Sequence, residues 1–179
     1  KKIKKSVDLM LTLLPFEADF YRQHQVPVSF VGHPLAQQFS GKSDKNCACT
    51  ELGLDPQRPV LCIMPGSRSS EVELLADLFL DSAEVVRQTL SADIQLVIPA
   101  ANQARYQQIE EILSHRPILN IRLLLQQSHR AMEAADVVLL ASGTTALEAM
   151  LLKKPMVVSY RFGAWTYKLL SKLIKTPYA

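Results

Sequence analysis

Apolar residues along the chain form short continuous runs, and the stretches between these runs carry an apolar residue every three or four positions. A continuous apolar run is typical of a strand buried on both faces, and the wider spacing is typical of a helix packed on one side. Residues 71–90 show the helical spacing clearly, with Val72, Leu75, Phe79 and Ala83 on one face. The pattern predicts strands at residues 7–14, 28–31, 60–64, 94–98, 121–125, 137–141 and 156–160. It predicts helices at residues 16–24, 46–52, 71–90, 103–114, 130–135, 144–152 and 165–175.

From residue 58 onward the expected strands and helices alternate. Alternation of this kind, with strands that are apolar throughout, predicts an α/β fold with a parallel sheet covered on both faces. We therefore expect a Rossmann-like, doubly wound sheet, in which ligands bind beyond the carboxyl ends of the strands. Residues 35–57 are polar and contain Gly41, Gly53 and Pro56, so they are predicted to be a connection between domains.

Composition narrows the functional classes. With 48% hydrophobic and 21% charged residues among 179, a packed core is expected. The net charge of +3 is too small to indicate nucleic-acid binding. The cysteines, Cys47, Cys49 and Cys62, form no C-x-x-C pair, which disfavours a disulfide framework or a zinc site and suits a reducing cytosol. An NAD-binding domain is disfavoured because no G-x-G-x-x-G follows a strand.

The strand at 60–64 runs into a loop with the character of a phosphate site. Gly66 allows a backbone to approach a ligand closely, Ser67 and the amides after it are donors, and Arg68 can hold phosphate through two parallel bonds. The competing interpretation is a well-capped helix, since Ser70-x-x-Glu73 fits a capping box.

The strand at 137–141 runs into a second such loop, Ser142-Gly143-Thr144-Thr145. Thr145-x-x-Glu148 also fits a capping box, which would make the motif only a helix start. If the helix instead begins at Thr144, Glu148 lies one turn further on the same face. A carboxylate there would repel phosphate but could accept hydrogen bonds from the diol of a ribose. Phosphate on the loop and ribose on Glu148 is the arrangement that a nucleoside diphosphate needs.

Three further residues follow predicted strands or turns. Arg161 comes directly after the strand at 156–160, so it either joins the same site or lies on the surface. Asn102 is expected to cap the helix that follows it. His33 lies in a Gly-His-Pro turn, where a structural role is favoured over a place in a cleft.

Several segments resemble one bacterial family in order along nearly the whole chain. They are "LPFEADFY", "FVGHPLAQ", "MPGSRSSEVE", "VIPAANQAR", "LLASGTTALEAMLLKKPMVVSYR" and "KLIKTPYA". Together they are similar to the lipid-A-disaccharide synthases, which are two-domain glycosyltransferases of the GT-B type. The first and third segments, with the Gly-His-Pro turn, are quite specific to this family, whereas Ser-Gly-Thr-x-Ala-Leu-Glu is shared with other GT-B enzymes.

The resemblance implies a reaction and a set of site residues. The family transfers 2,3-diacylglucosamine from its UDP carrier to 2,3-diacylglucosamine 1-phosphate with inversion, forming the β-1,6 disaccharide of lipid A and releasing UDP. No metal or other cofactor is implied. By analogy, the diphosphate would contact Gly66, Ser67 and Arg68. The nucleotide pocket would be lined by Ser142, Gly143, Thr144 and Thr145. Glu148 would bind the ribose, and Arg161 is a weaker analogy.

The resemblance also implies how the chain is divided. Residues 1–34 correspond to the tail of a second Rossmann-like domain that binds the acceptor, 35–57 to the connection, and 58–179 to most of the domain that binds the UDP-sugar donor. An inverting transfer needs a base that takes the proton from the acceptor hydroxyl. The family places the candidate base in its N-terminal part, before Lys1, so no catalytic residue is assigned in this chain. The isolated segment is expected to be inactive.

The family's partners follow from its acylated substrates. We expect a cytoplasmic enzyme that associates peripherally with the inner membrane, and a homodimer is left open; nucleic acid is not among the partners. The basic amphipathic helix predicted at 165–175 and the lysines of residues 1–5 fit an anionic interface. The competing interpretation is a helix that packs on the sheet with solvated lysines.

Two alternatives to this function stay open. One is another GT-B UDP-sugar enzyme, such as a peptidoglycan N-acetylglucosaminyltransferase or a non-hydrolysing epimerase, which should ignore the acyl chains. The other is a segment that binds UDP without catalysis.

Overall fold

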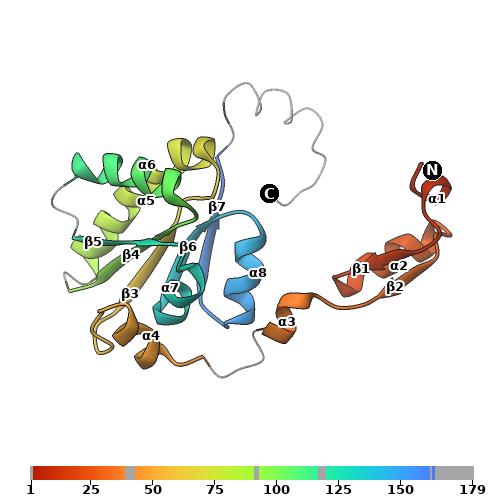
Figure 1. The fold of residues 1–179 in the computed structure, drawn as a ribbon, viewed down its shortest axis with the longest axis horizontal. Coiled ribbons are helices and arrows are strands. Elements are labelled where there is room, and N and C mark those ends of the chain that lie inside the picture. Colours follow the sequence, from red (N-terminus) through yellow and green to blue (C-terminus); the bar gives the residue numbers. More distant parts are fainter. Residues whose placement is uncertain (1, 39–42, 91–92, 117–119, 162, 164–179) are drawn as a thin grey trace. The chain divides into compact units, whose positions relative to one another are not determined.

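The computed structural model describes residues 2–38, 43–90, 93–116, 120–161 and 163, and the chain divides into two compact units, Lys1–Lys42 and Ser43–Ala179 (Figure 1). The division falls inside the predicted connection of residues 35–57. Helix α3 (Pro34–Gln38) belongs to the first unit and α4 (Lys45–Glu51) to the second. Whether the first unit is part of an acceptor domain stays a prediction.

The first unit is a parallel pair of strands, β1 (Met10–Thr12) and β2 (Val28–Phe30), joined by helix α2 (Pro15–Gln23). Strand β1 is much shorter than the predicted 7–14, because pairing ends where its three-residue partner ends. Two short helices, α1 (Lys2–Ser6) and α3, were not predicted. His33 stands just before α3, where its Nδ1 accepts a hydrogen bond from Leu35 N (3.2 Å), so it has the expected structural role in a turn.

The second unit contains the predicted parallel sheet. Its strands lie in the order β5-β4-β3-β6-β7, and every neighbouring pair is parallel. The strands are β3 (Val60–Met64), β4 (Gln95–Ala100), β5 (Ile121–Leu125), β6 (Val137–Ala141) and β7 (Met156–Ser159). The chain moves outward from β3 to β5 and then returns to the other side of β3. The doubly wound prediction is therefore confirmed, and the topological switch point lies between β3 and β6.

Helices cover both faces of this sheet (Figure 1). Helices α5 (Ser69–Thr89) and α6 (Gln103–Ser114) lie together on one face, and α4, α7 (Ser128–Ala134) and α8 (Thr144–Leu151) lie on the other. The predicted helices match to within two residues, except that the one predicted at 165–175 lies outside the described residues. No helix in the described ranges is long and apolar enough to span a bilayer.

The core on the α5 face consists of alternate strand residues and the apolar side of α5. Leu61 and Ile63 of β3 are buried in one cluster with Leu75 and Phe79 of α5. Burying one such side chain contributes about 1.5–3 kcal/mol, so this cluster fixes α5 firmly on the sheet. The start of α5 is thereby held at the carboxyl edge.

Carboxylates tie α4 to the opposite, amino edge of the sheet. Asp136, just before β6, accepts hydrogen bonds from Val60 N (2.8 Å) and from Lys45 Nζ (2.7 Å). Glu133 is buried and accepts from Asp44 N (3.0 Å) and from the Arg130 guanidinium (2.7 Å). Burial by itself raises the pKa of Glu133, but these hydrogen bonds and the Arg130 charge outweigh burial and hold the pKa below its ordinary value. These bonds explain why α4 belongs to the second unit.

Candidate functional site

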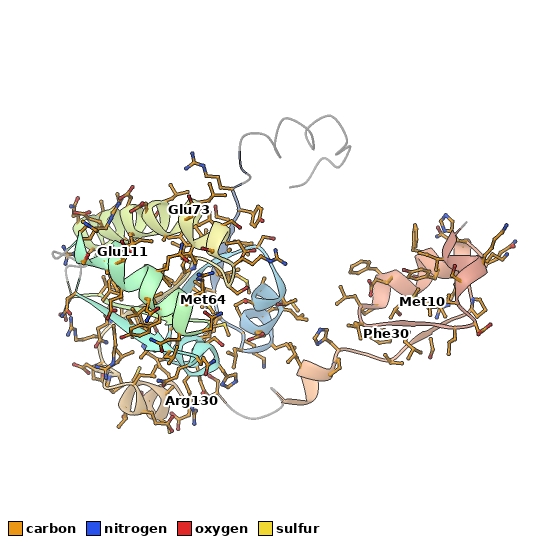
Figure 2. All side chains as sticks on the ribbon, turned by 45° about the horizontal axis from the view of Figure 1, so that its top comes forward. Met10, Phe30, Met64, Glu73, Glu111 and Arg130 are labelled. Atoms are coloured by element: carbon orange, nitrogen blue, oxygen red, sulfur yellow. The ribbon has the colours of Figure 1, made fainter. Side chains whose placement is uncertain are left out.

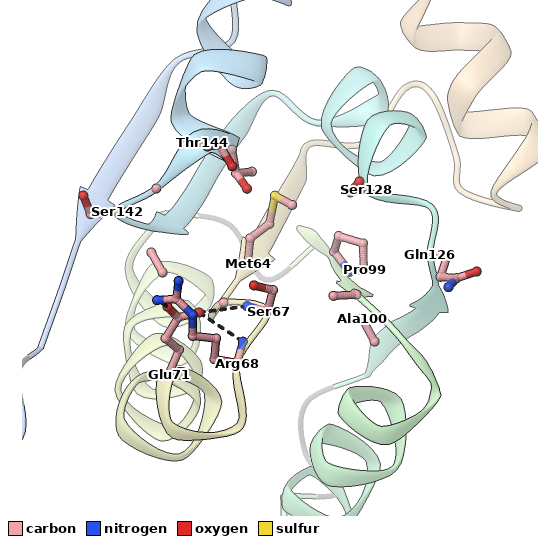
Figure 3. Close-up of a pocket in the computed structure, with 15 residues that line it drawn as sticks. Met64, Ser67, Arg68, Glu71, Pro99, Ala100, Gln126, Ser128, Ser142 and Thr144 are labelled. Carbon is pink, nitrogen blue, oxygen red and sulfur yellow. Dashed lines mark hydrogen bonds and ion pairs between the residues drawn. The ribbon is translucent and has the colours of Figure 1, made fainter. Parts of the chain in front are cut away.

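A pocket of about 450 Å³ opens at the carboxyl edge of the sheet, beside the switch point (Figure 3). The loops after β3, β4, β5 and β6 all contribute to its lining. Seven of the nine residues predicted from the sequence line it: Gly66, Ser67, Arg68, Ser142, Gly143, Thr144 and Thr145. The pocket thus lies at the edge where ligands bind in sheets of this kind, and both loops singled out in the sequence line it.

On the β3 side, the loop into α5 is closed by the side chain of Glu71. Its Oε2 accepts hydrogen bonds from Ser67 N (3.0 Å) and Arg68 N (3.1 Å) (Figure 3). Gly66 has a φ of +125°, and a Cβ there would lie 2.6 Å from Glu71 Cβ and Oε2. Glycine is therefore required both by the backbone conformation and by the carboxylate packed against it.

This arrangement differs from the sequence expectation in two respects. Helix α5 begins at Ser69 with Arg68 as its N-cap and Glu71 at the N3 position, so the Ser70-x-x-Glu73 capping box is wrong. Only half of a capping box forms, two residues earlier: Glu71 accepts from Arg68 N, while the arginine side chain has no acceptor to return. The amides of Ser67 and Arg68, expected to be open to phosphate, are already bonded to Glu71. The next amides, Ser69 N and Ser70 N, have no acceptor in the described part of the chain, but these residues do not line the pocket. Within the pocket, this loop offers an anion the Ser67 hydroxyl and the Arg68 side chain.

The Arg68 side chain is 77% exposed, and one of its nitrogens is paired with the Glu71 carboxylate. Nη1 lies 3.1 Å from Glu71 Oε1, an ion pair within the same turn. In Figure 3 the guanidinium lies beside Glu71, and the loop after β6 faces it across the pocket. The guanidinium is therefore available to a ligand that enters between the two loops.

On the β6 side, no side chain of the described residues accepts hydrogen bonds from the amides of the loop into α8. The N-cap is Gly143, which has no side chain to make a capping hydrogen bond, and the helix begins at Thr144. The Thr145-x-x-Glu148 capping box is therefore wrong, because Thr145 already lies inside the helix. Within the described part of the chain, no acceptor is recorded for the N–H groups of Gly143, Thr144 and Thr145. Three free donors and the positive end of the helix dipole thus face the pocket.

Glu148 lies one turn further along α8, as expected for a helix that begins at Thr144. Its side chain is half-buried, and it does not belong to the residues that line the pocket. Arg161 lies two residues beyond β7 and is exposed, also outside the lining. The structure thus brings seven of the predicted residues together and leaves Glu148 and Arg161 outside the lining of the pocket.

The far half of the pocket was not predicted. It is formed by residues at the ends of β4 and β5, among them Pro99, Ala100, Gln126 and Ser128. Gln126 follows β5 directly and has a φ of +57°. The strand-end rule could have identified these positions, but nothing in their residue types points to a ligand. Asn102, in contrast, caps α6 as expected, accepting from Arg105 N (2.9 Å).

Glu71 is the residue of the site that the sequence interpretation missed. Its position three residues after Arg68 was the available signal, but Glu73 three residues after Ser70 is the stronger sequence match to a capping box. Among the described residues there is no group of three or more His, Cys, Asp or Glu side chains that could hold a metal ion. The polar groups that line the pocket are backbone amides, hydroxyls, the side-chain amide of Gln126, the Glu71 carboxylate and the Arg68 guanidinium.

Comparison with known proteins agrees with the sequence resemblance. The family model for lipid-A-disaccharide synthetase matches residues 1–179. The lipid-A-disaccharide synthase of Alcanivorax borkumensis is 53% identical over 178 residues, which are 99% of this chain and 46% of that protein. The one from Pseudomonas entomophila is 51% identical over 177 residues, again 99% of this chain and 46% of that protein.

Among solved structures, a mutant of S. aureus TarM in complex with fondaparinux, alpha-GlcNAc-glycerol and UDP covers 92% of this chain and 32% of that chain. Its sequence identity is 15% and its TM-score 0.49, too weak a likeness to support an argument. This chain spans about half the length of the curated relatives it matches. On the family model and on these relatives, the chain belongs to the lipid-A-disaccharide synthetase family.

Proposed function

We propose that the second unit is the donor-binding half of a lipid-A-disaccharide synthase. In this proposal it holds UDP-2,3-diacylglucosamine while the sugar is transferred to 2,3-diacylglucosamine 1-phosphate, forming the β-1,6 disaccharide with inversion. The observation that carries the proposal is the uncapped start of α8, which faces the exposed Arg68 across one pocket. Free amides at a helix start together with an arginine form a suitable site for a diphosphate.

The proposed role of the β6–α8 loop is to hold the diphosphate and stabilise it as the leaving group. When the bond from the sugar to the diphosphate breaks, negative charge grows on the phosphate oxygens. Fixed donors that already point at this position stabilise that charge without reorganising. The amides of Gly143, Thr144 and Thr145 and the hydroxyls of both threonines supply such donors, and Arg68 supplies a full positive charge. Ser67 and Ser142 complete the polar lining.

Glu148 is proposed to bind the ribose at the edge of the phosphate site. Its side chain has no hydrogen-bond partner among the described residues, so the carboxylate is free to accept bonds from a diol. Helix geometry supports this role, because Glu148 lies one turn from Thr144 on the same side of α8. Arg161, exposed after β7, is proposed as a weaker contributor.

The proposal leaves the proton transfer to a base outside this chain. An inverting transfer needs a general base on the acceptor hydroxyl, opposite the leaving group. The residues of the pocket bind and stabilise the donor side only, and no described residue is assigned as that base. Association with the inner membrane from the cytoplasmic side is part of the proposal, since both substrates carry acyl chains.

The test is donor specificity in the full-length enzyme. UDP-2,3-diacylglucosamine or UDP-N-acetylglucosamine is incubated with 2,3-diacylglucosamine 1-phosphate, and released UDP and the disaccharide are quantified by mass spectrometry. We expect product only with the acylated donor. Equal turnover of the unacylated donor, or UDP binding without any transfer, would reject the proposal in favour of another UDP-sugar enzyme or a binding protein.

A further inference from the structure

The carboxylate of Glu71 lies in a place where a phosphate binds in many glycine-rich loops. It accepts from two consecutive amides, Ser67 N and Arg68 N, and pairs with the Arg68 guanidinium. Although it borders the pocket, its side chain is only 13% exposed. Successive amides at a helix start make an anion-binding concavity, and here an anion from the protein itself occupies it.

These contacts go beyond helix capping. A glutamate at N3 ordinarily bonds the N-cap amide alone, whereas Glu71 also bonds the amide one residue before the cap and the side chain of the cap residue. Gly66 has the conformation that leaves room for this carboxylate. A second brace fixes the same turn, since Gln108 Nε2 of α6 donates to Ser69 O (3.2 Å).

The pairing determines how Arg68 meets a ligand. A free arginine side chain loses about 2 kcal/mol of rotamer entropy when it is ordered. Holding Nη1 on Glu71 Oε1 restricts the side chain beforehand, while its 77% exposure leaves the remaining N–H donors accessible. A donor that is ordered before binding costs less to engage.

We infer that Glu71 is a positioning residue for the diphosphate of the donor: it closes the Ser67 and Arg68 amides to anions and orients Arg68 toward the α8 side of the pocket. This inference rests on the proposed function. It requires the carboxylate to stay on the loop when ligand binds. The opposite case is a carboxylate that only fills an empty phosphate site and is displaced by the ligand.

The two cases differ in the sign of the effect of Glu71→Gln on nucleotide affinity. The full-length enzyme and its Glu71→Gln variant are titrated with UDP and with uridine, using calorimetry for UDP and ligand-observed NMR for the weaker nucleoside. Glutamine is neutral and has only one acceptor oxygen, so it cannot hold both amides and the guanidinium as the carboxylate does. We therefore expect UDP to bind about five- to tenfold more weakly. Uridine, which has no phosphate, should bind within about twofold of wild type.

Glu73→Gln is the matched control. It removes the same charge by the same isosteric change two residues along α5, from an exposed side chain outside the pocket. It should leave the affinity for UDP unchanged.

Several results would overturn the inference: tighter binding of UDP by Glu71→Gln, unchanged binding, or an equal loss for UDP and uridine. If wild type binds no UDP, the proposed function itself fails, and the inference fails with it.

A double-mutant cycle distinguishes orientation of Arg68 from general damage to the fold. If Glu71 acts through Arg68, Glu71→Gln should have little further effect on UDP affinity once Arg68 is alanine. Additive losses in the double variant would contradict a positioning role. Thermal denaturation of all four proteins confirms that each is folded at the titration temperature.

Discussion

Helices α5 and α8 both begin at the carboxyl edge of the sheet, on either side of the switch point. At α5 the amides of Ser67 and of the N-cap residue Arg68 are bonded to Glu71, whereas the amide of Gly143, the N-cap residue of α8, has no acceptor in the described part of the chain. The two starts thus present different charges to the same pocket: a neutralised turn with a projecting arginine, and an open set of N–H donors. Strand-helix turns of similar composition are therefore not equivalent sites, and the position of one carboxylate distinguishes them (Figure 2 shows the side chains of the described residues).

The largest expected effect comes from exchanging Gly66 for alanine, and the same change at Gly143 in the other turn is its comparison. Gly66→Ala forces a Cβ to within 2.6 Å of Glu71 at a φ of +125°, so we expect the free energy of unfolding to fall by about 2–4 kcal/mol. Gly143 has extended backbone, and a Cβ added there would meet no atom within 4 Å, so Gly143→Ala should change stability by less than about 0.5 kcal/mol. Urea denaturation measures both, and equal losses would contradict the difference between the turns.

Removing Arg68, the exposed arginine of the α5 turn, should have the next largest effect. We expect Arg68→Ala to weaken UDP binding roughly 10- to 100-fold, because charged hydrogen bonds to phosphate contribute about 1.5–3 kcal/mol. Calorimetric titration measures the change, with Arg87→Ala near the far end of α5 as a control of equal charge. An affinity that is the same in both variants would show that Arg68 is only a solvated side chain.

A smaller effect is expected at Glu148, which belongs to the open side. Glu148→Gln should weaken UDP binding about three- to tenfold, because an amide accepts hydrogen bonds from a ribose less strongly than a carboxylate. Binding of inorganic pyrophosphate should be unchanged, since it has no ribose. Equal affinity of wild type and variant for UDP would remove Glu148 from the site and leave the loop amides as its only α8 component.

The smallest effect on the pocket is expected from Glu133, a buried carboxylate that accepts from an amide and an arginine at the amino edge. Its pKa is held below the ordinary value near 4.5, so its stabilising contribution is present above that pH and is lost as the pH falls through the folded-state pKa. Glu133→Gln should therefore reduce the loss of stability on acidification and leave UDP affinity unchanged. Denaturation midpoints measured from pH 7 down to pH 3 test this, and an unaltered pH profile would contradict it.

Much of the second unit was predictable because its strands are continuous apolar runs, of which the central β3 and β4 are buried almost throughout. The runs at 60–64, 121–125 and 137–141 coincide with the observed strand limits, and their order along the chain indicated a doubly wound sheet. The first unit was less predictable. Its apolar run at 7–14 lacks a partner of equal length, so pairing rather than composition sets the limits of β1.

The site was predictable as a location but not in its hydrogen bonding. Two overlapping four-residue patterns, starting at Arg68 and at Ser70, compete for the cap of α5, and sequence propensity favours the serine. The turn at Gly66 decides otherwise, because it places Glu71 under the amides of Ser67 and Arg68. At α8 the extended backbone of Gly143 starts the helix one residue before Thr145, which leaves the threonine hydroxyls outside the capping position.

A crystal structure of the full-length enzyme with UDP would show which of the two helix starts binds the diphosphate. We expect phosphate oxygens within hydrogen-bond distance of the Gly143, Thr144 and Thr145 amides and of the Arg68 guanidinium, with Glu71 still bonded to Ser67 N and Arg68 N. A diphosphate bound to the Ser67 and Arg68 amides, with the Glu71 carboxylate displaced from them, would contradict this expectation.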